Sequence, residues 1–191
     1  DMQALSRGLS GGGAGAGRPQ RGGTLNVCRR IERARVIFED HGDFLRQEPA
    51  VARLMGELES QWRSSWRTME ETGIVAACRQ CEEEDGGSCC GRGIEDGYSE
   101  TLLLLNLLFD VVLPDAGLFE DSCYFLGPSG CRLKIREVLC VNYLCTAVQK
   151  RLSAADLARV QQAVGCELDT VFLLQETVKR LLKDRCDTVV I

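Results

Sequence analysis

Apolar side chains recur at three- and four-residue steps near the start of the chain, a spacing that places them on one face of a helix. These positions are Val27, Ile31, Ala34, Phe38 and Leu45. His41 falls on the same face, where we expect a core histidine with satisfied hydrogen bonds rather than a metal ligand. Gly42 is the residue at which we expect this helix to end or kink.

A second apolar stripe follows directly. Its members are Val51, Leu54, Met55, Leu58, Trp62, Trp66 and Met69. Glu48 and Pro49 form a typical helix start, and we expect the helix to end near Gly73. Trp62 and Trp66 lie one turn apart, and we interpret them as packing anchors rather than a base-stacking platform. The two stripes predict an N-terminal arm of two helices.

Two further helical regions are predicted. Ser99 is a suitable cap for a short helix over residues 102–109, which is apolar on nearly all sides and is therefore expected to be buried. This run is shorter than the ~20 residues that span a membrane, so no membrane contact is expected. Residues 153–156 are related to a capping box and open a C-terminal helix. The inward positions that follow are Leu157, Val160, Val164, Leu168, Val171, Phe172, Leu174, Val178, Leu181 and Leu182.

These elements predict a mainly α protein, a helical bundle with a loop-rich cysteine-cluster segment inserted between N-terminal and C-terminal helices. The length of 191 residues fits one domain. We assign residues 1–23 to a disordered glycine-rich tail, 24–73 to the helical arm, and 74–191 to the cysteine-cluster domain with the C-terminal helices. The tail has too few large apolar side chains to offset the entropy of ordering.

Charge narrows the choice of partners. The 23 basic and 28 acidic side chains give a net charge of −5, which disfavours a nucleic-acid partner because no excess of cations neutralises phosphates. Residues 1–27 contain no apolar run of the length found in signal peptides. We therefore expect a cytoplasmic location, where cysteines stay reduced and more often bind metal or carry out chemistry than form disulfides.

Cysteine is the unusual component, because the chain has eleven of them against a single histidine. One histidine excludes sites that need several imidazoles. Eight of the cysteines lie within residues 78–145, among frequent glycines. These are the predicted metal ligands Cys78, Cys81, Cys89, Cys90, Cys123, Cys131, Cys140 and Cys145. Deprotonated sulfur selects zinc or an iron–sulfur cluster over harder ions.

The spacing leaves open whether one or two four-thiolate sites form. A tight turn at the Cys-x2-Cys pair would bring the sulfurs of Cys78 and Cys81 together. If only one site forms, we expect its ligands to be Cys78, Cys81, Cys123 and Cys131. We also expect hydrogen bonds to sulfur from the backbone N–H groups of Gly91, Gly93 and Gly130.

Three cysteines lie outside this cluster, on predicted helices or near the C-terminus. They are Cys28, Cys166 and Cys186. Free cysteines are often buried small hydrophobic side chains, and that is the role we expect for these three.

The middle segment resembles the YkgJ-type cysteine-cluster family, a zinc- or iron-chelating domain. The resemblance rests on the Cys78/Cys81 pair, the Cys89–Cys90 doublet, the phrase CYFLGPSGC at 123–131, and IREVLCVNYLC with Cys140 and Cys145 at its end. It covers about a third of the chain. Two features differ from the family pattern: the acidic insert EEEDGGS, and Glu137 where the family usually has proline after arginine.

Three functions remain open at this point. The first is a small metal-binding protein in which thiolates hold zinc or an iron–sulfur cluster that stabilises the loops. The second is an iron–sulfur redox or methyl-transfer enzyme, which the resemblance implies because some relatives are flagellin lysine methylases. The third is an exported disulfide scaffold. No nucleotide-binding loop or acid–base pair identifies catalytic residues, and the protein partner is not indicated.

Overall fold

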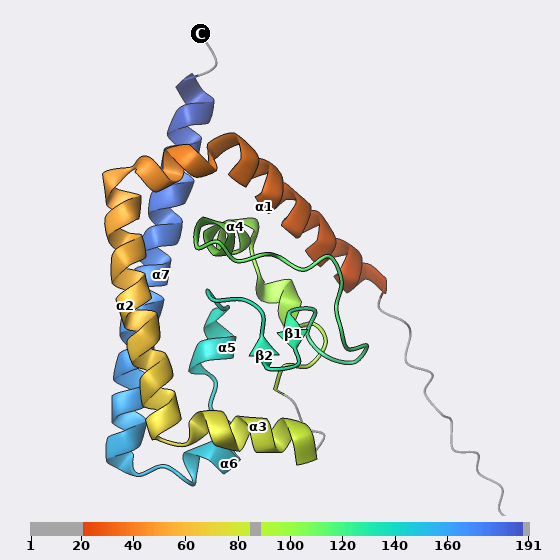
Figure 1. The fold of residues 1–191 in the computed structure, drawn as a ribbon, viewed down its shortest axis with the longest axis vertical. Helices are drawn as coiled ribbons and strands as arrows, with labels where there is room; N and C mark the ends of the chain where they lie inside the picture. The colour runs from red at the N-terminus through yellow and green to blue at the C-terminus, as the bar shows by residue number, and fades with distance from the viewer. Residues whose placement is uncertain (1–20, 85–88, 189–191) are drawn as a thin grey trace, which may run out of the picture.

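The chain is mainly helical in a computed structural model, which describes residues 21–84 and 89–188 (Figure 1). The longer helices are α1 (Arg21–Gln47), α2 (Pro49–Glu71), α3 (Ile74–Glu84), α4 (Glu100–Leu108) and α7 (Ala154–Thr188). The short elements are the 3-10 turn η1 (Ile94–Gly97), the strands β1 (Leu126–Gly127) and β2 (Gly130–Cys131), and the helices α5 (Val138–Asn142) and α6 (Thr146–Gln149). The predicted fold class is confirmed: the loop-rich segment lies between the N-terminal and C-terminal helices.

The N-terminal arm shows one confirmed boundary and one correction. Pro49 occupies the first turn of α2, as its sequence predicts, and Thr72 caps the other end before Gly73, whose φ of +77° favours glycine. Gly42 does not end α1, which continues to Gln47. A Cβ at this position would lie 2.8 Å from the Phe38 ring, so the packing there favours glycine. Residues 1–20 of the predicted tail lie outside the described residues.

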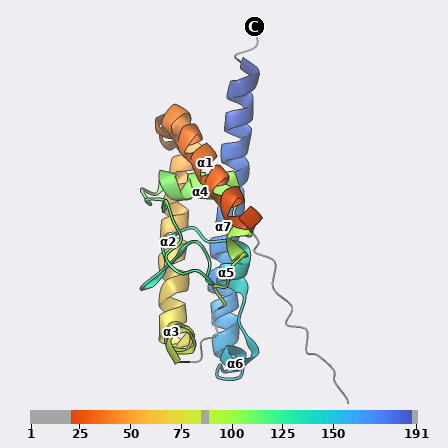
Figure 2. The same ribbon diagram turned by 90° about the vertical axis from the view of Figure 1, so that its right-hand side faces the viewer.

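Helices α2 and α7 run side by side in opposite directions and form the long axis of the molecule (Figures 1 and 2). Helix α1 crosses near one end of this pair and covers α4, whereas α3 and α6 lie near the other end. The strands β1 and β2 and helix α5 fill the space between. The helices thus surround the segment that carries most of the cysteines.

Two clusters of buried side chains hold the elements together. The main core includes all of the buried leucines of α4 together with Tyr98, Phe125 and Ile135, and α1, α2 and α7 pack against it. A smaller core near α3 and α6 consists of Met69, Ile74, Val141, Val148, Val160 and Val164. Because α7 supplies side chains to both cores, it connects the two ends of the molecule.

Helix α4 is the buried helix that the sequence predicts. The Ser99 hydroxyl accepts a hydrogen bond from the Leu102 N–H at 3.1 Å and so caps the first turn. Four consecutive leucines, 102–105, are at most 5% exposed. The Asn106 side chain is also buried, and it accepts hydrogen bonds from the backbone of Lys134 and Ile135, which joins α4 to the cysteine segment. Across the described part of the chain, no helix has the length and apolar character needed to cross a membrane.

The C-terminal helix α7 begins with the predicted cap. The Asp156 N–H donates to the Ser153 hydroxyl at 3.0 Å, and this hydroxyl donates to the Asp156 carboxylate at 2.8 Å. The helix then continues for 35 residues, through Gly165. Most of its predicted inward positions are confirmed as buried or half-buried, but Phe172 is 61% exposed.

Candidate metal centre

The eight candidate ligands come from separate parts of the chain that the fold brings near one another. Cys78 and Cys81 lie on α3, Cys140 lies on α5, and Cys145 caps α6. Cys131 lies on β2. The Cys89–Cys90 segment is joined to the segment before β1 by the Cys123 N–H, which donates to the Cys90 carbonyl at 2.6 Å. An antiparallel bridge between Gly91 and Ser122 continues this pairing.

Four of these cysteines form what we call the inner group: Cys90, Cys123, Cys131 and Cys140. Burial raises the pKa of Cys123 to about 12, and the neighbouring thiols of Cys131 and Cys140 add to the shift. Burial also raises the pKa of Cys140, with contributions from Cys131 and Cys90. Cys131 is an exposed residue, yet desolvation around its thiol raises its pKa as well. Cys131 thus lies within electrostatic range of each of the other three thiols.

The other four form the outer group: Cys78, Cys81, Cys89 and Cys145. Desolvation raises the pKa of Cys78, and the thiols that add to this shift are those of Cys89, Cys145, Cys81 and Cys90. Cys78 and Cys89 are exposed, whereas Cys81 and Cys145 are half-buried. Cys90 acts on thiols of both groups, so it lies at the junction between them.

This arrangement differs from the two sequence expectations about local geometry. The Cys-x2-Cys pair does not lie on a tight turn, because residues 74–84 form the helix α3. Strong helix formers such as Ala76, Ala77 and Gln80 surround the pair and explain the helix. The expected single set of Cys78, Cys81, Cys123 and Cys131 is divided, with two members in the outer group and two in the inner group.

Within the described residues, backbone hydrogen bonds to two of the sulfurs come from Phe125 and Leu133, which the sequence did not predict. Backbone hydrogen bonds from Phe125 and Leu133 oppose the rise in the pKa of Cys123 and Cys131, respectively. In both cases the donor lies two residues after the cysteine. The Gly93 N–H instead donates to the Glu95 carboxylate at 2.9 Å. This glycine has a φ of +98°, so its role is to form the turn that enters η1.

Tyr98 is a neighbour of the inner group that sequence analysis missed. Its hydroxyl donates to Cys140 Sγ at 3.7 Å, and a side-chain hydrogen bond from Tyr98 also lowers the pKa of Cys131. Burial raises the pKa of the phenol itself far above its ordinary value. The signal available in the sequence was only its position directly before the cap residue Ser99.

Two cations of the segment between β2 and α5 lie over the predicted tryptophan anchors. The Arg136 guanidinium lies 5.6 Å from the Trp66 ring centre, and Lys134 Nζ lies 4.9 Å from that of Trp62. The positive charge of Arg136 lowers the pKa of Cys131. Its Nη2 atom is buried and has no hydrogen-bond partner within the described residues. The tryptophans therefore connect α2 to the inner group.

The residues outside the cluster give mixed outcomes. Cys28 is half-buried against the main core, 3.6 Å from the Tyr124 hydroxyl. Cys166 is exposed, so its predicted burial is wrong: it lines an open groove of about 440 Å³ between α2 and α7. The side chain of Cys186 lies outside the described residues. His41 is half-buried, but its Nδ1 atom lacks a hydrogen-bond partner among the described residues, contrary to expectation.

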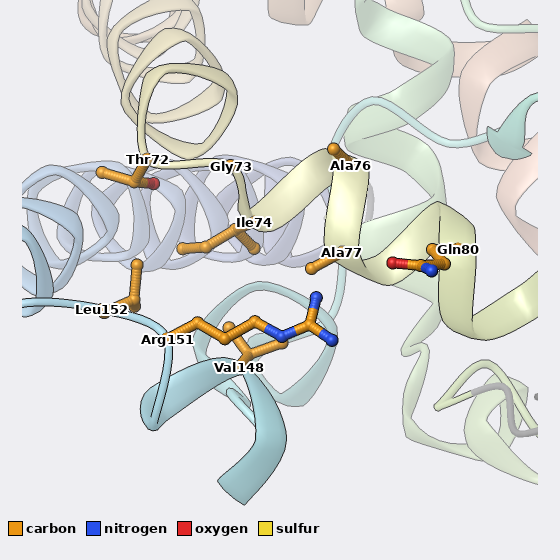
Figure 3. Close-up of a pocket in the computed structure, with 9 residues that line it drawn as sticks. All are labelled: Thr72, Gly73, Ile74, Ala76, Ala77, Gln80, Val148, Arg151 and Leu152. Carbon is orange, nitrogen blue, oxygen red and sulfur yellow. The ribbon is translucent and has the colours of Figure 1, made fainter.

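A pocket of about 250 Å³ lies between α3 and α6 and is lined by none of the candidate ligands (Figure 3). Its lining is apolar apart from Thr72, Gln80 and Arg151, and the Arg151 side chain extends along it toward Ala77. Among residues 21–84 and 89–188, no three Cys, His, Asp or Glu side chains are arranged around one ion position. Ligation would therefore require the thiols of a group to move closer together.

Comparisons of the chain with protein families, with curated proteins and with solved structures gave no match.

Proposed function

We propose that this chain is a metal-binding cysteine-cluster protein whose thiols hold zinc or an iron–sulfur cluster. The observation that carries the proposal is that thiols from separate segments lie within electrostatic range of one another, around Cys78 in the outer group and around Cys131 in the inner group. Four thiolates are the ligand set of structural zinc and of iron–sulfur clusters alike. Because Cys90 lies in range of thiols of both groups, the arrangement fits one site or two.

The raised pKa values support ligation over nucleophilic chemistry. A thiol with a pKa of about 12, such as Cys123, is protonated at neutral pH and is a poor nucleophile. A bound cation would remove this penalty, because coordination replaces the thiol proton, which is released to solvent. Buried neighbouring thiols are therefore stable without metal and become ligands when a soft cation is present.

Hydrogen bonds to sulfur provide further support. The backbone of Phe125 and of Leu133 favours the ionised form of the cysteine two residues before it. Such contacts orient thiolate ligands and reduce their charge in protein metal sites. Arg136 adds a positive charge near Cys131, which would offset part of the negative charge of a four-thiolate site.

The test is anaerobic purification followed by metal analysis and an absorption spectrum. Broad absorption near 400 nm with stoichiometric iron and sulfide identifies a cluster, whereas a colourless protein with bound zinc identifies a zinc site. A protein that binds neither zinc nor iron overturns the proposal.

Substitutions then assign the ligands. We expect Cys131→Ser in the inner group and Cys78→Ser in the outer group each to lower metal content and thermal stability together. Cys166→Ser is the matched control, because this cysteine is exposed and lies outside both groups. If Cys78→Ser and Cys131→Ser each remove half of the metal, two sites are present.

A further inference from the structure

Tyr98 differs from an ordinary core aromatic residue in where its hydroxyl points. The residue is 1% exposed, and its ring packs against Phe125 with 4.8 Å between ring centres. A buried phenol needs a hydrogen-bond partner, because an unsatisfied hydroxyl costs about 1–3 kcal/mol. The partner here is the sulfur atom of a candidate ligand, Cys140, at 3.7 Å.

The backbone around Tyr98 is fixed by three independent contacts. The Tyr98 N–H donates to the Glu95 carbonyl at 3.2 Å, which closes η1. The Tyr98 carbonyl accepts a hydrogen bond from the Arg30 guanidinium of α1 at 2.7 Å. The next residue, Ser99, caps α4. The phenol is therefore held in place from η1, α1 and α4 rather than by the cysteine segment itself.

The oxygen of the phenol is also oriented. A backbone hydrogen bond from Glu137 favours the ionised form of Tyr98, as an N–H donor to its oxygen does. With one lone pair engaged in this way, the O–H bond is free to point toward sulfur. Glu137 stands where proline, which has no N–H, would remove this donor.

We propose that Tyr98 is a positioning residue of the inner group, whose hydroxyl donates to Cys140 Sγ and orients this sulfur as a metal ligand. This inference rests on the proposed metal-binding function. Hydrogen bonds to an ionised sulfur are stronger than those to a neutral one, so the contact strengthens when metal replaces the thiol proton. Tyr98 thereby favours the ligating state without contacting the metal.

Tyr98→Phe tests this role, and Tyr124→Phe is a closely matched control. Tyr124 is also buried, its ring also packs on Phe125, and its hydroxyl lies 3.6 Å from the sulfur of Cys28, which belongs to neither group. Both variants keep the ring and remove one hydroxyl beside a cysteine. Only Tyr98→Phe removes a hydrogen bond to a candidate ligand, Cys140.

Cobalt titration supplies the first readout, because thiolate-to-cobalt absorption bands report directly on the sulfur ligands. We expect Tyr98→Phe to bind cobalt about tenfold more weakly than the unsubstituted chain and to shift these bands, and Tyr124→Phe to leave both unchanged. If the unsubstituted chain binds no cobalt, the proposed function fails. If it binds cobalt and Tyr98→Phe binds equally well, only the role of Tyr98 is overturned.

The pH profile of alkylation supplies a readout that needs no metal. Because the Tyr98 hydrogen bond lowers the pKa of Cys140, its removal should move alkylation of Cys140 to higher pH. Peptide mass spectrometry of the metal-free chain, treated with iodoacetamide over a pH series, measures this shift. An unchanged profile for Cys140, or an equal shift in Tyr124→Phe, contradicts the inference.

Discussion

The inner and outer groups place the same residue type in two different settings. Three of the inner cysteines, Cys90, Cys123 and Cys140, pack against or belong to the main core. In the outer group Cys145 packs against the smaller core, while Cys78 and Cys89 are exposed. The contrast teaches that the packing around each thiol, rather than the spacing of cysteines in the sequence, decides what can reach it.

The two settings imply different roles within one protein. Three of the inner thiols, those of Cys123, Cys131 and Cys140, have hydrogen-bond donors on sulfur, which come from Phe125, Leu133 and Tyr98, respectively. The outer thiols depend on α3 and α6, which contact each other at the far end of the molecule. We infer that the inner group sets the geometry and the outer group is the more accessible entry point.

The largest expected effect comes from removing the side chain beneath the inner group. Phe125 is 0% exposed, and Phe125→Ala should lower the free energy of unfolding by about 3–5 kcal/mol because a cavity replaces the ring. Urea denaturation measures the loss. Alkylation of Cys123 should accelerate while that of Cys78 stays the same, and equal acceleration at both would contradict the separation of the groups.

Solvent access should separate the groups in the intact protein. Cys78 is exposed and Cys123 is 5% exposed, so in the metal-free chain we expect iodoacetamide to modify Cys78 faster by on the order of tenfold or more. Time-resolved peptide mass spectrometry gives both rates from one sample. Similar rates for the two cysteines in the folded protein would contradict the contrast between the inner and outer groups. The rates in denatured protein provide the reference.

The raised pKa of Cys123 also predicts a dependence of stability on pH. Because the folded chain holds this pKa at about 12 against an ordinary 9.0, the native state favours the neutral thiol. Its contribution is complete below pH 9 and is lost as the pH rises toward 12. By pH 10 the loss amounts to about 1 kcal/mol. Urea denaturation of the metal-free chain at pH 8 and 10 should therefore show a smaller decrease for Cys123→Ala than for the unsubstituted protein.

The smallest effect should come from Arg136. Arg136→Gln removes the cation over Trp66 and the charge that lowers the pKa of Cys131. We expect a loss of about 0.5–1 kcal/mol in the free energy of unfolding and a shift of Cys131 alkylation to higher pH. Arg136→Lys keeps the charge and should retain the alkylation profile. A shift at Cys78 as well would show that the two groups respond together.

Much of the helical fold could be predicted because its signals are local. Pro49, Ser99 and Ser153 each act within one turn, and each begins a helix as predicted. Gly42 could not be judged in this way, because a glycine ends a helix only if the surrounding structure allows it. Around Gly42 the Phe38 ring fills the space that a side chain would need.

Less of the candidate site than of the fold could be predicted from the sequence. Cysteine type and number identified the region, but the division into groups depends on contacts between distant residues, such as the hydrogen bond between Cys123 and Cys90. Tyr98 was missed because its thiol partner lies 42 residues away, and the residues next to Tyr98 in the sequence give no sign of this contact. The helix at Cys78 was missed because a Cys-x2-Cys pair suggested a turn more strongly than the surrounding alanines suggested a helix.

Helix α7 has a consequence for how the whole chain unfolds. Val160 and Val164 belong to the smaller core, while Val171, Leu174 and Val178 of the same helix belong to the main core. Helix α7 thus contributes to both cores, so unfolding of one core should destabilise the other. Because one continuous helix links the two cores, metal bound as proposed near one core should also stabilise the helices that pack on the other.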